Sequence, residues 1–273
     1  MILINGRPEN RIEVADRGLQ YGDGLFETIA YRNGQLEFIS EHLSRLLEGC
    51  KRLKIVFSAE QQQLLINEVH AVCQQLKNDA VIKVILTRGA GGRGYRYQAD
   101  MQTTRIISTH PLPIYPATHA SGITVRICQQ RLASNPSLAG IKHLNRLEQI
   151  LARNEWQDDT IAEGLMFDHQ ERLIEGTMSN VFLVQGNQLW TPELSNAGIA
   201  GIMRQKLIET AQQLGITINV TSLNVEQLKQ ADELFVCNSL IGIWPITQIA
   251  DYAMELLHGP LTKQLQQTLI SRH

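Results

Sequence analysis

Cysteine is scarce in this chain, and its spacing excludes two kinds of site. The 273 residues include four cysteines, at positions 50, 73, 128 and 237, without any Cys-x-x-Cys pair. Disulfide frameworks and structural zinc sites both need cysteines in closely spaced sets. The eight histidines lack metal-ligand spacing as well. We therefore expect buried free thiols in a reducing compartment, and no bound metal.

The sequence also gives no indication of a membrane span, a leader peptide or a basic surface. No apolar run approaches the roughly 20 residues that cross a bilayer. The N-terminal segment Met1–Arg7 turns polar after four residues, unlike a signal peptide. The net charge is −2, whereas nucleic-acid-binding proteins usually carry a basic excess. We expect a cytoplasmic protein that acts on a small molecule and binds neither membrane nor nucleic acid.

What is present is an ordinary globular composition, with 43% hydrophobic and 19% charged residues. This length is sufficient for two modest domains or one large one. The segment His110–Ser121 contains three prolines and cannot form a regular helix. We expect an N-terminal domain over residues 1–112, a linker over 113–121 and a C-terminal domain over 122–273.

Hydrophobic periodicity predicts a mixed fold of the α+β or α/β class. The Asn33-Gly34 pair predicts a hairpin that joins strands 25–31 and 35–39. Ser40 is a candidate N-cap for the amphipathic helix that follows. The other expected elements are strands 1–4, 81–87, 104–109, 122–131, 162–168, 180–184, 216–220 and 233–238, and helices 59–76, 143–157, 203–214, 225–230 and 261–271.

Lys142 has unusual surroundings for a lysine. It lies in Ala139–Glu148, where the pattern predicts a loop that turns into a helix. A cation there is unfavourable because a helix N-terminus attracts anions. A solvated surface lysine is the ordinary interpretation; a Schiff base, which converts the ammonium to an imine, is the alternative. We interpret the adjacent His143 as a packing or capping residue rather than a general base.

A second polar segment, Glu175–Asn180, follows a predicted strand–turn–strand unit. A glutamate at the end of a hairpin is usually exposed, so Glu175 alone is a weak signal. The segment also supplies hydroxyls and the Asn180 amide, which can orient a carboxylate or a phenolic oxygen. A lysine that carries pyridoxal phosphate requires a carboxylate that faces the pyridine nitrogen.

The glycine before the helix predicted at 203–214 provides a candidate anion site. Gly201 precedes Ile202 and Met203, whose backbone N–H groups have no partner inside a helix that begins here. Such a terminus binds phosphate readily. A glycine before a helix is common, so this signal needs support from other residues.

Together these segments resemble the fold-type-IV pyridoxal-phosphate enzymes, which include branched-chain aminotransferases, D-amino acid aminotransferases and aminodeoxychorismate lyases. The resemblance covers almost the whole chain. It implies a smaller N-terminal α/β sandwich, a larger C-terminal pseudo-barrel that binds the cofactor, and a homodimer. The segments that carry it are Asp16–Thr28, His42–Leu46, Lys142–Glu148, Glu175–Asn180, Gly201–Arg204 and Ala231–Ser239.

The resemblance implies a role for each candidate residue. Lys142 would bind pyridoxal 5'-phosphate covalently, and Glu175 would contact the pyridine nitrogen. Arg45 would clamp the phosphate, although from its place beside an apolar helix face it could also snorkel. The other implied cofactor contacts are Asn180, Ile202, Met203 and Ser239.

Two segments favour the lyases within this class. Asn135–Glu148 closely resembles the lyase sequence around the lysine, and Arg88–Tyr95 resembles the lyase glycine-rich loop. The substrate of these lyases has two carboxylates, which need cations and amides nearby, and Arg93 and Tyr95 could supply them. The alternative is that the glycine-rich loop is only a mobile hairpin tip. Thr28 is a further substrate-side candidate.

The resemblance implies conversion of 4-amino-4-deoxychorismate to 4-aminobenzoate and pyruvate, for folate synthesis. The substrate amine would displace Lys142 from the cofactor, and the freed lysine would then take the ring C4 proton. Two alternatives remain open at this point. One is an aminotransferase of the same fold for D-amino or branched-chain acids, and the other is a metabolite-binding protein without catalysis.

Overall fold

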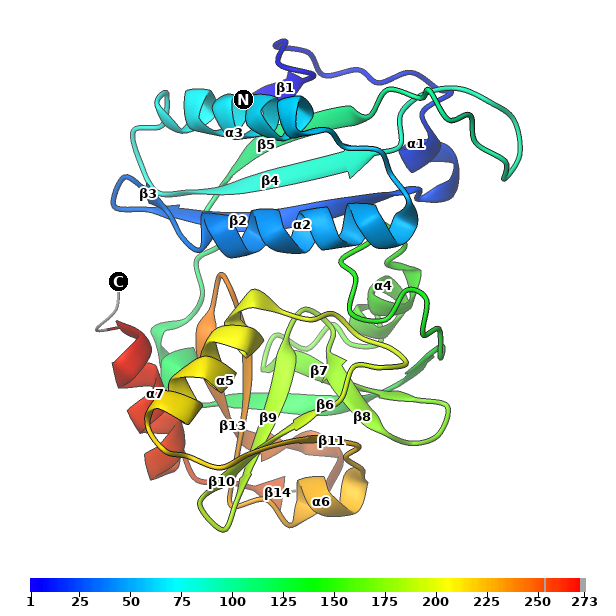
Figure 1. Cartoon of the computed structure of the whole chain (residues 1–273). Coiled ribbons are helices and arrows are strands. Elements are labelled where there is room, and N and C mark those ends of the chain that lie inside the picture. Colours follow the sequence, from blue (N-terminus) through cyan, green and yellow to red (C-terminus); the bar gives the residue numbers. More distant parts are fainter. Residues whose placement is uncertain (253, 271–273) are drawn as a thin grey trace. The chain divides into compact units, whose positions relative to one another are not determined.

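The computed structural model describes residues 1–252 and 254–270, and its contacts divide the chain into two compact units (Figure 1). The first unit comprises Met1–Pro113 and Ile141–Asn145, and the second comprises Ile114–Gly140 and Arg146–His273. The expected fold class, mixed α/β, is confirmed. We expected a single change of domain, at the proline-rich segment His110–Ser121. The chain instead returns to the first unit at Ile141–Asn145, and Lys142 therefore belongs to the first unit.

The first unit contains one twisted sheet with the strand order β1-β5-β4-β2-β3. All neighbouring strands in it pair antiparallel. Its elements are β1 (Ile2–Ile4), α1 (Arg17–Tyr21), β2 (Gly24–Arg32), β3 (Gln35–Leu36), α2 (Ile39–Leu53), α3 (Ala59–Cys73), β4 (Ala80–Thr87) and β5 (Thr104–Pro111).

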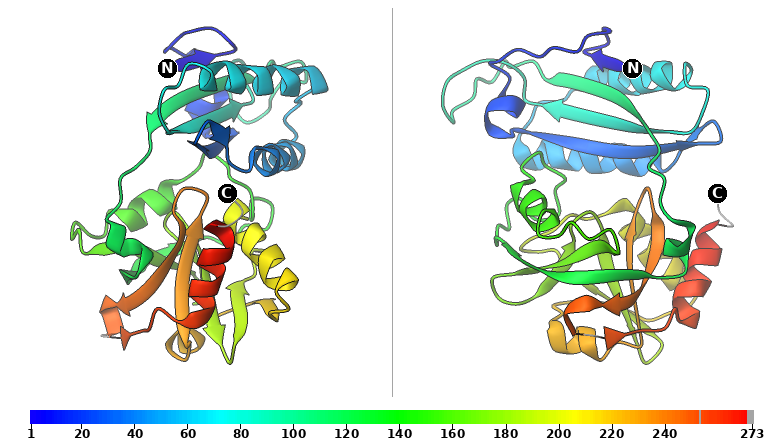
Figure 2. Two further views of the ribbon diagram at one scale, coloured as in Figure 1. Left: turned by 90° about the vertical axis from the view of Figure 1, so that its left-hand side faces the viewer. Right: turned by 180° about the vertical axis from the view of Figure 1, so that it is seen from behind.

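Alternation along β2 divides its side chains between the two faces of this sheet. Leu25 and Ile29 point into the core, where they pack with Leu46 of α2 and Leu65 of α3. Figure 2 shows both helices on the same side of the sheet. Phe26 and the other even-numbered residues of β2 therefore lie on the opposite face, away from the helices.

The second unit is built on a larger sheet with the order β11-β10-β9-β12-β13-β6-β7-β8, to which β14 adds beside β13. Its elements are η1 (Ala117–Ala120), β6 (Ile123–Leu132), α4 (Leu147–Arg153), β7 (Ile161–Asp168), β8 (Leu173–Gly176), β9 (Asn180–Gln185), β10 (Gln188–Pro192), α5 (Ile202–Gln213), β11 (Ile218–Thr221), α6 (Val225–Lys229), β12 (Glu233–Asn238), β13 (Gly242–Ile249), η2 (Ala250–Tyr252), β14 (Met254–Glu255) and α7 (Pro260–Ile270).

The sheet of the second unit has apolar side chains on both faces. One face contributes Val181, Leu234 and Val236 to the main core of the unit. On the other face, Phe182 and Phe235 stack with ring centroids 5.0 Å apart. Contacts of α5 and α7 with β12, and of α7 with β13, cover part of the sheet (Figure 1). Burial on both sides explains why these strands are continuous apolar runs.

The structure corrects several expected boundaries. Phe38, in a left-handed conformation with φ of 53°, is the N-cap of α2, so Ser40 lies inside the helix. The helix expected over 143–157 is shorter, and α4 begins only at Leu147. Strand β13 contains Pro245, paired opposite Phe235; we did not predict it, because proline disfavours a central strand.

All four cysteines are free and buried, as expected. Burial raises the pKa of Cys50 and Cys128 to about 12, and that of Cys73 to about 11. These thiols therefore stay protonated at neutral pH and pack as small apolar groups. The described residues contain no helix long and apolar enough to cross a membrane, and no cluster of histidine, cysteine or acidic side chains that could hold a metal ion.

Buried Asp16 joins three separate parts of the first unit. Its carboxylate accepts hydrogen bonds from the Gly18 N–H at 2.8 Å and from the hydroxyls of Thr87 at 2.9 Å and Thr104 at 2.7 Å. It therefore caps α1 and ties that helix to β4 and β5. The side chain is 1% exposed, so water cannot replace a lost acceptor.

We expect Asp16→Ala to lower the free energy of unfolding by about 3 kcal/mol, because it leaves three donors without their acceptor. Urea unfolding followed by circular dichroism measures this change. The matched control is Asp158→Ala, which removes an exposed aspartate that accepts from the backbone N–H and hydroxyl of Thr160. An equal loss of stability in the two variants would contradict the explanation.

Candidate functional site

Lys142 lies on a short extended segment that pairs with the start of β2. The Phe26 N–H donates to the Lys142 carbonyl at 3.0 Å, and the Leu144 N–H donates to the Gly24 carbonyl at 3.0 Å. An isolated bridge also joins Leu25 and His143. The lysine is therefore held by strand-like backbone pairing. The expectation that it stands at a helix start is wrong, since α4 begins at Leu147.

Glycines on the N-terminal side of β2 make this pairing possible. A Cβ on Gly24 would lie 2.5 Å from the Leu86 carbonyl oxygen and 2.8 Å from the Leu144 side chain. Gly22 has φ of 65°, and a Cβ there would lie 2.5 Å from the Asn145 side chain. A larger residue would collide with the Leu86 backbone of β4 or with the side chains of Leu144 and Asn145 in the lysine segment. This lack of space explains why glycine stands at positions 22 and 24 of the segment Tyr21–Phe26.

The Lys142 side chain extends over the ring of Phe26. Its Nζ lies 4.3 Å from the ring centroid, within the range of a cation–π interaction. The Nζ of Lys83 approaches the same ring at 5.7 Å. Lys83 is the cross-strand partner of Thr28, so this face of the sheet brings together both ammonium groups and the Thr28 side chain. The sequence analysis missed Lys83 because a lysine in a strand resembles any solvated residue.

Arg45 is engaged by a buried glutamate on the helix-covered face of the sheet. Its Nε and Nη2 donate to the two carboxylate oxygens of Glu27, at 2.8 and 2.5 Å. The Nδ1 of His42 is 2.6 Å from the same carboxylate, and the His42 Nε2 has no hydrogen-bond partner among the described residues. Bidentate pairing fixes the orientation of the guanidinium. Arg45 therefore does not snorkel into solvent.

Glu175 is deeply buried at the end of β8, with 3% of its surface exposed. Its carboxylate accepts from the Ile199 N–H at 2.8 Å and from the Gln149 amide at 3.2 Å. Arg146 interacts with it electrostatically. The general expectation for a hairpin glutamate, exposure to solvent, is wrong here. Neither Gln149 nor Ile199 was predicted, since only the fold brings them to Glu175.

The loop that holds Glu175 also holds the chain that leads to Lys142. Ile199 forms an isolated parallel bridge with Gly140. The Gly140 N–H donates to the Gly198 carbonyl at 2.8 Å, and the Ala200 N–H donates to the Gly140 carbonyl at 3.1 Å. Gly140 precedes Lys142 by two residues in the sequence. Gly140, which ends one segment of the second unit, is thus fixed by the same loop that donates to Glu175.

Asn180, the first residue of β9, meets the start of α5. Its amide donates to the Ile199 carbonyl at 2.8 Å. A Cβ on Gly201 would lie 2.0 Å from the Asn180 Oδ1, so only glycine fits there. Gly201 is the N-cap of α5 and provides no side chain to cap Ile202 and Met203. The structure therefore brings Asn180 together with the predicted anion-binding amides.

Ser239 directly follows β12, whose last residues pair with the start of β9. Cys237, two residues earlier, pairs directly with Asn180. The Asn238 side chain accepts from the N–H groups of Leu240 and Ile241, at 2.8 and 3.0 Å, and so shapes the turn that presents Ser239. The strand that leads to Ser239 thus pairs with the strand that begins at Asn180, and a phosphate contact by Ser239 stays a prediction.

Arg93 and Tyr95 lie on the exposed loop between β4 and β5. Arg17 donates to the carbonyls of Gly94 at 2.9 Å and Tyr95 at 3.3 Å, and the Gly94 N–H donates to the Tyr21 hydroxyl at 3.1 Å. The Tyr95 side chain is 89% exposed, with its ring 5.9 Å from that of Tyr21. The loop backbone is anchored, and substrate contacts by its side chains stay a prediction.

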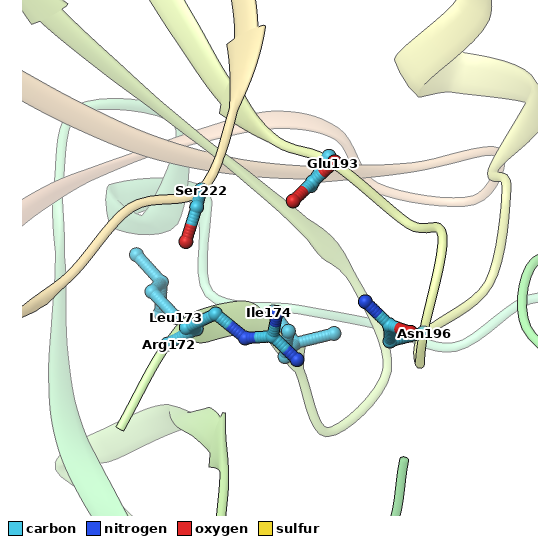
Figure 3. A pocket seen from close by; sticks show the side chains of 6 residues that line it. All are labelled: Arg172, Leu173, Ile174, Glu193, Asn196 and Ser222. Carbon is cyan, nitrogen blue, oxygen red and sulfur yellow. The ribbon is translucent and has the colours of Figure 1, made fainter. Parts of the chain in front are cut away.

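A small hollow in the second unit is lined in part by the residues that precede Glu175 in the sequence, but Glu175 itself does not line it. Figure 3 shows the side chains that line it, with the Arg172 guanidinium among them. Arg172 is also bonded to Asp168, its Nε donating at 2.7 Å. None of the predicted cofactor contacts lines this hollow. Its lining residues are Arg172, Leu173, Ile174, Glu193, Asn196 and Ser222.

Comparison with known proteins identifies the family. Residues 24–249 match the model of the family described as amino-transferase class IV. The chain is 36% identical to a curated aminodeoxychorismate lyase of Vibrio harveyi, over 98% of this chain and 99% of that one. The chain therefore belongs to the amino-transferase class IV family, and the expected resemblance is confirmed.

Solved structures agree with this assignment over the full length. A 4-amino-4-deoxychorismate lyase from Pseudomonas aeruginosa is 45% identical, with a TM-score of 0.94 and coverage of 98% of both chains. A branched-chain amino acid aminotransferase from Escherichia coli is 26% identical, with a TM-score of 0.86 and coverage of 98% of this chain and 92% of that one. Lyases and aminotransferases thus share this fold.

The Glu27 carboxylate makes the first unit sensitive to acid. Burial acts to raise the pKa of Glu27, but hydrogen bonds from Arg45 and His42 outweigh it and hold that pKa below the ordinary value of 4.5. Because the folded pKa is lowered, the ionised carboxylate stabilises the fold above pH 4.5. That stability is lost as the pH falls through the folded pKa.

We expect Glu27→Gln to lower the free energy of unfolding at pH 7 by about 3 kcal/mol, because it leaves Arg45 without its buried anion. The difference between wild type and variant should shrink as the pH is lowered below 4.5. Thermal unfolding followed by circular dichroism at pH 7 and pH 4 measures both effects. A difference that stays constant over this range would contradict the role of the ionised carboxylate.

Proposed function

We propose that this protein is a pyridoxal-phosphate-dependent lyase that converts 4-amino-4-deoxychorismate to 4-aminobenzoate and pyruvate. The observation that carries the proposal is the full-length likeness to the lyase from Pseudomonas aeruginosa, at 45% identity. The amino-transferase class IV family supports the choice of cofactor. The resemblance of Asn135–Glu148 and Arg88–Tyr95 to lyases supports the choice of reaction over amino transfer.

The residues of the second unit fit the polar ends of pyridoxal phosphate. The N-terminus of α5 has a glycine cap and no side-chain cap, so its amides suit a phosphate. Ser239 and Asn180 belong to the same part of the sheet. Glu175 is a buried carboxylate oriented by Ile199 and Gln149, which suits a protonated pyridine nitrogen. We propose Ile202, Met203, Ser239, Asn180 and Glu175 as cofactor contacts.

The first unit supplies the proposed nucleophile and a further cation. We propose that Lys142 binds the cofactor covalently and that Arg45, oriented by Glu27, contributes to phosphate binding. Phe26 provides an apolar, polarizable surface under the Lys142 amine. The ring holds the amine in one place, where it can meet the cofactor.

The cofactor, when bound, supplies a pyridine ring that accepts electrons from a carbanion. Glu175 would hold the ring nitrogen in its protonated form and so sustain that capacity. With the cofactor held in the site, Lys142 would provide the amine that attaches it and the base that takes the proton from ring carbon C4 of the substrate. Lys83 and Lys142 give one face of the sheet a positive charge that attracts a dicarboxylate substrate.

The reaction is balanced without a second substrate. Loss of the C4 proton and cleavage of the enolpyruvyl ether bond give the aromatic ring of 4-aminobenzoate, and protonation of the departing enolpyruvate at its methylene gives pyruvate. Aromatisation provides the driving force. An aminotransferase instead requires a 2-oxo acid and two half-reactions. This difference in stoichiometry separates the lyase from its alternative.

We further propose that the protein is a homodimer. The proposal rests on the resemblance to the fold-type-IV enzymes.

We expect Lys142→Ala to lower the rate of pyruvate formation from 4-amino-4-deoxychorismate by about 10³-fold or more, because both the covalent attachment and the proton acceptor are lost. The visible absorption of the lysine-bound cofactor should disappear in the same variant. Pyruvate is measured with a lactate dehydrogenase assay, and 4-aminobenzoate by fluorescence. The control is Lys229→Ala, which removes a lysine paired with Glu226 on α6.

Two results would contradict the proposal at different levels. Wild-type protein that transfers amino groups to 2-oxo acids but releases no pyruvate from 4-amino-4-deoxychorismate would be an aminotransferase. Wild-type protein without the visible absorption, even after incubation with pyridoxal phosphate, would be a binding protein that has lost the cofactor.

A further inference from the structure

We propose that Glu163 is a positioning residue, whose buried carboxylate shapes the turn between Glu175 and Asn180 and so sets both proposed cofactor contacts. The inference rests on the proposed function, because it concerns residues assigned to the cofactor. Glu163 lies on β7 and is 1% exposed. Neither its sequence context nor its distance along the chain from Glu175 suggests this role.

One carboxylate oxygen of Glu163 organises the start of the turn. The Oε1 accepts from the Thr177 N–H at 3.0 Å and from the Thr177 hydroxyl at 2.5 Å. It also accepts from the N–H of Gly164 at 2.9 Å. The Thr177 N–H lies 3.0 Å from the Gly164 carbonyl as well, so the turn is attached to β7 by side chain and backbone together.

The other oxygen organises the end of the turn. The Oε2 accepts from the Met178 N–H at 3.2 Å and from the Ser179 hydroxyl at 2.7 Å. The Gly176 N–H donates to the Ser179 carbonyl at 2.7 Å, which closes the turn around the carboxylate. Backbone N–H groups can only donate, so this arrangement requires that both carboxylate oxygens of Glu163 act as acceptors.

The turn has little room to adopt another shape. A Cβ on Gly176 would lie 2.3 Å from the Ser179 hydroxyl and 2.8 Å from the Glu163 Oε2. Pairing holds the chain on both sides, since Glu175 pairs with Met166 of β7 and Asn180 pairs with Cys237 of β12. Glu163 therefore controls the short connection between β8, which contains Glu175, and β9, which begins with Asn180.

A second buried glutamate provides a matched control. Glu233, which is 5% exposed, accepts from the N–H groups of Leu261 and Thr262 at 3.1 and 2.8 Å, and from the Thr262 hydroxyl at 2.6 Å. It belongs to the same unit and has the same kinds of donor, but it caps α7. Any general effect of damaging a buried carboxylate should therefore appear in both glutamine variants.

The test compares Glu163→Gln with Glu233→Gln in the full-length chain. In Glu163→Gln the new NH₂ group faces donors, so we expect faster amide hydrogen exchange in the peptide 175–180 of the cofactor-stripped protein. With cofactor, we expect about a tenfold or greater rise in the dissociation constant, a shifted pH titration of its visible absorption, and a kcat about 10²-fold lower. Glu233→Gln should leave the exchange of this peptide and the absorption titration unchanged.

Two substitutions of Thr177, whose hydroxyl donates to Glu163, test the same hydrogen bond from the donor. Thr177→Val removes the hydroxyl bonded to Glu163 and should shift the absorption titration in the same direction as Glu163→Gln. Thr177→Ser keeps the hydroxyl and should restore wild-type behaviour.

The outcomes separate this inference from the proposed function. If wild-type protein binds pyridoxal phosphate but both glutamine variants bind it equally well, Glu163 is merely structural and the positioning role is wrong. Unchanged exchange in the peptide 175–180 of Glu163→Gln would also overturn it. If wild-type protein binds no cofactor, the proposed function fails, and the positioning role fails with it.

Discussion

The pairing of Ile141–Asn145 with the start of β2 is the interaction on which the proposed site depends. Two backbone hydrogen bonds, between Phe26 and Lys142 and between Leu144 and Gly24, hold the lysine as an extra strand-like segment. The Gly22 and Gly24 positions have no room for a side chain. A lysine on a regular helix or a free loop would sample many positions, whereas this one is fixed over the Phe26 ring at 4.3 Å. Backbone geometry thus fixes where the lysine lies on the sheet.

Buried carboxylates satisfied by hydrogen bonds recur throughout both units. Asp16 ties α1 to the first sheet, Glu27 orients Arg45, Glu163 closes the turn before β9, and Glu233 caps α7. A buried charge is costly unless its oxygens accept several hydrogen bonds, and each of these does. Because such a network tolerates little change in geometry, it holds neighbouring loops in one conformation. The turn between Glu175 and Asn180, two proposed cofactor contacts, is held in this way.

Local signals in the sequence were sufficient for most elements of the fold. The Asn33-Gly34 hairpin, the strands with apolar runs and the helices with clear periodicity are present, because these features depend on neighbours a few residues away. Errors occurred where a distant partner overrides local preference. The N-cap of α2 is a local exception, because the helix begins at Ile39 and Phe38 rather than Ser40 precedes it. Pro245, by contrast, is accommodated in β13 by strand pairing, although it cannot donate to the sheet. The predicted start of α4 was wrong for the same reason, since pairing with β2 keeps residues 141–145 extended.

The sequence by itself determined the family, the candidate lysine and carboxylate, and the glycine before α5, because each is a residue type at a characteristic place in a motif. It could not determine which side chains meet Glu175 and Arg45. Gln149, Ile199 and Glu27 contact them only through tertiary packing. Glu163 illustrates the difference most clearly. It is an unremarkable acid within a strand until the antiparallel pairing of β7 with β8 brings the turn after Glu175 around its carboxylate. Hydrogen bonds between residues far apart in sequence depend on the register of strands, which only the folded chain sets.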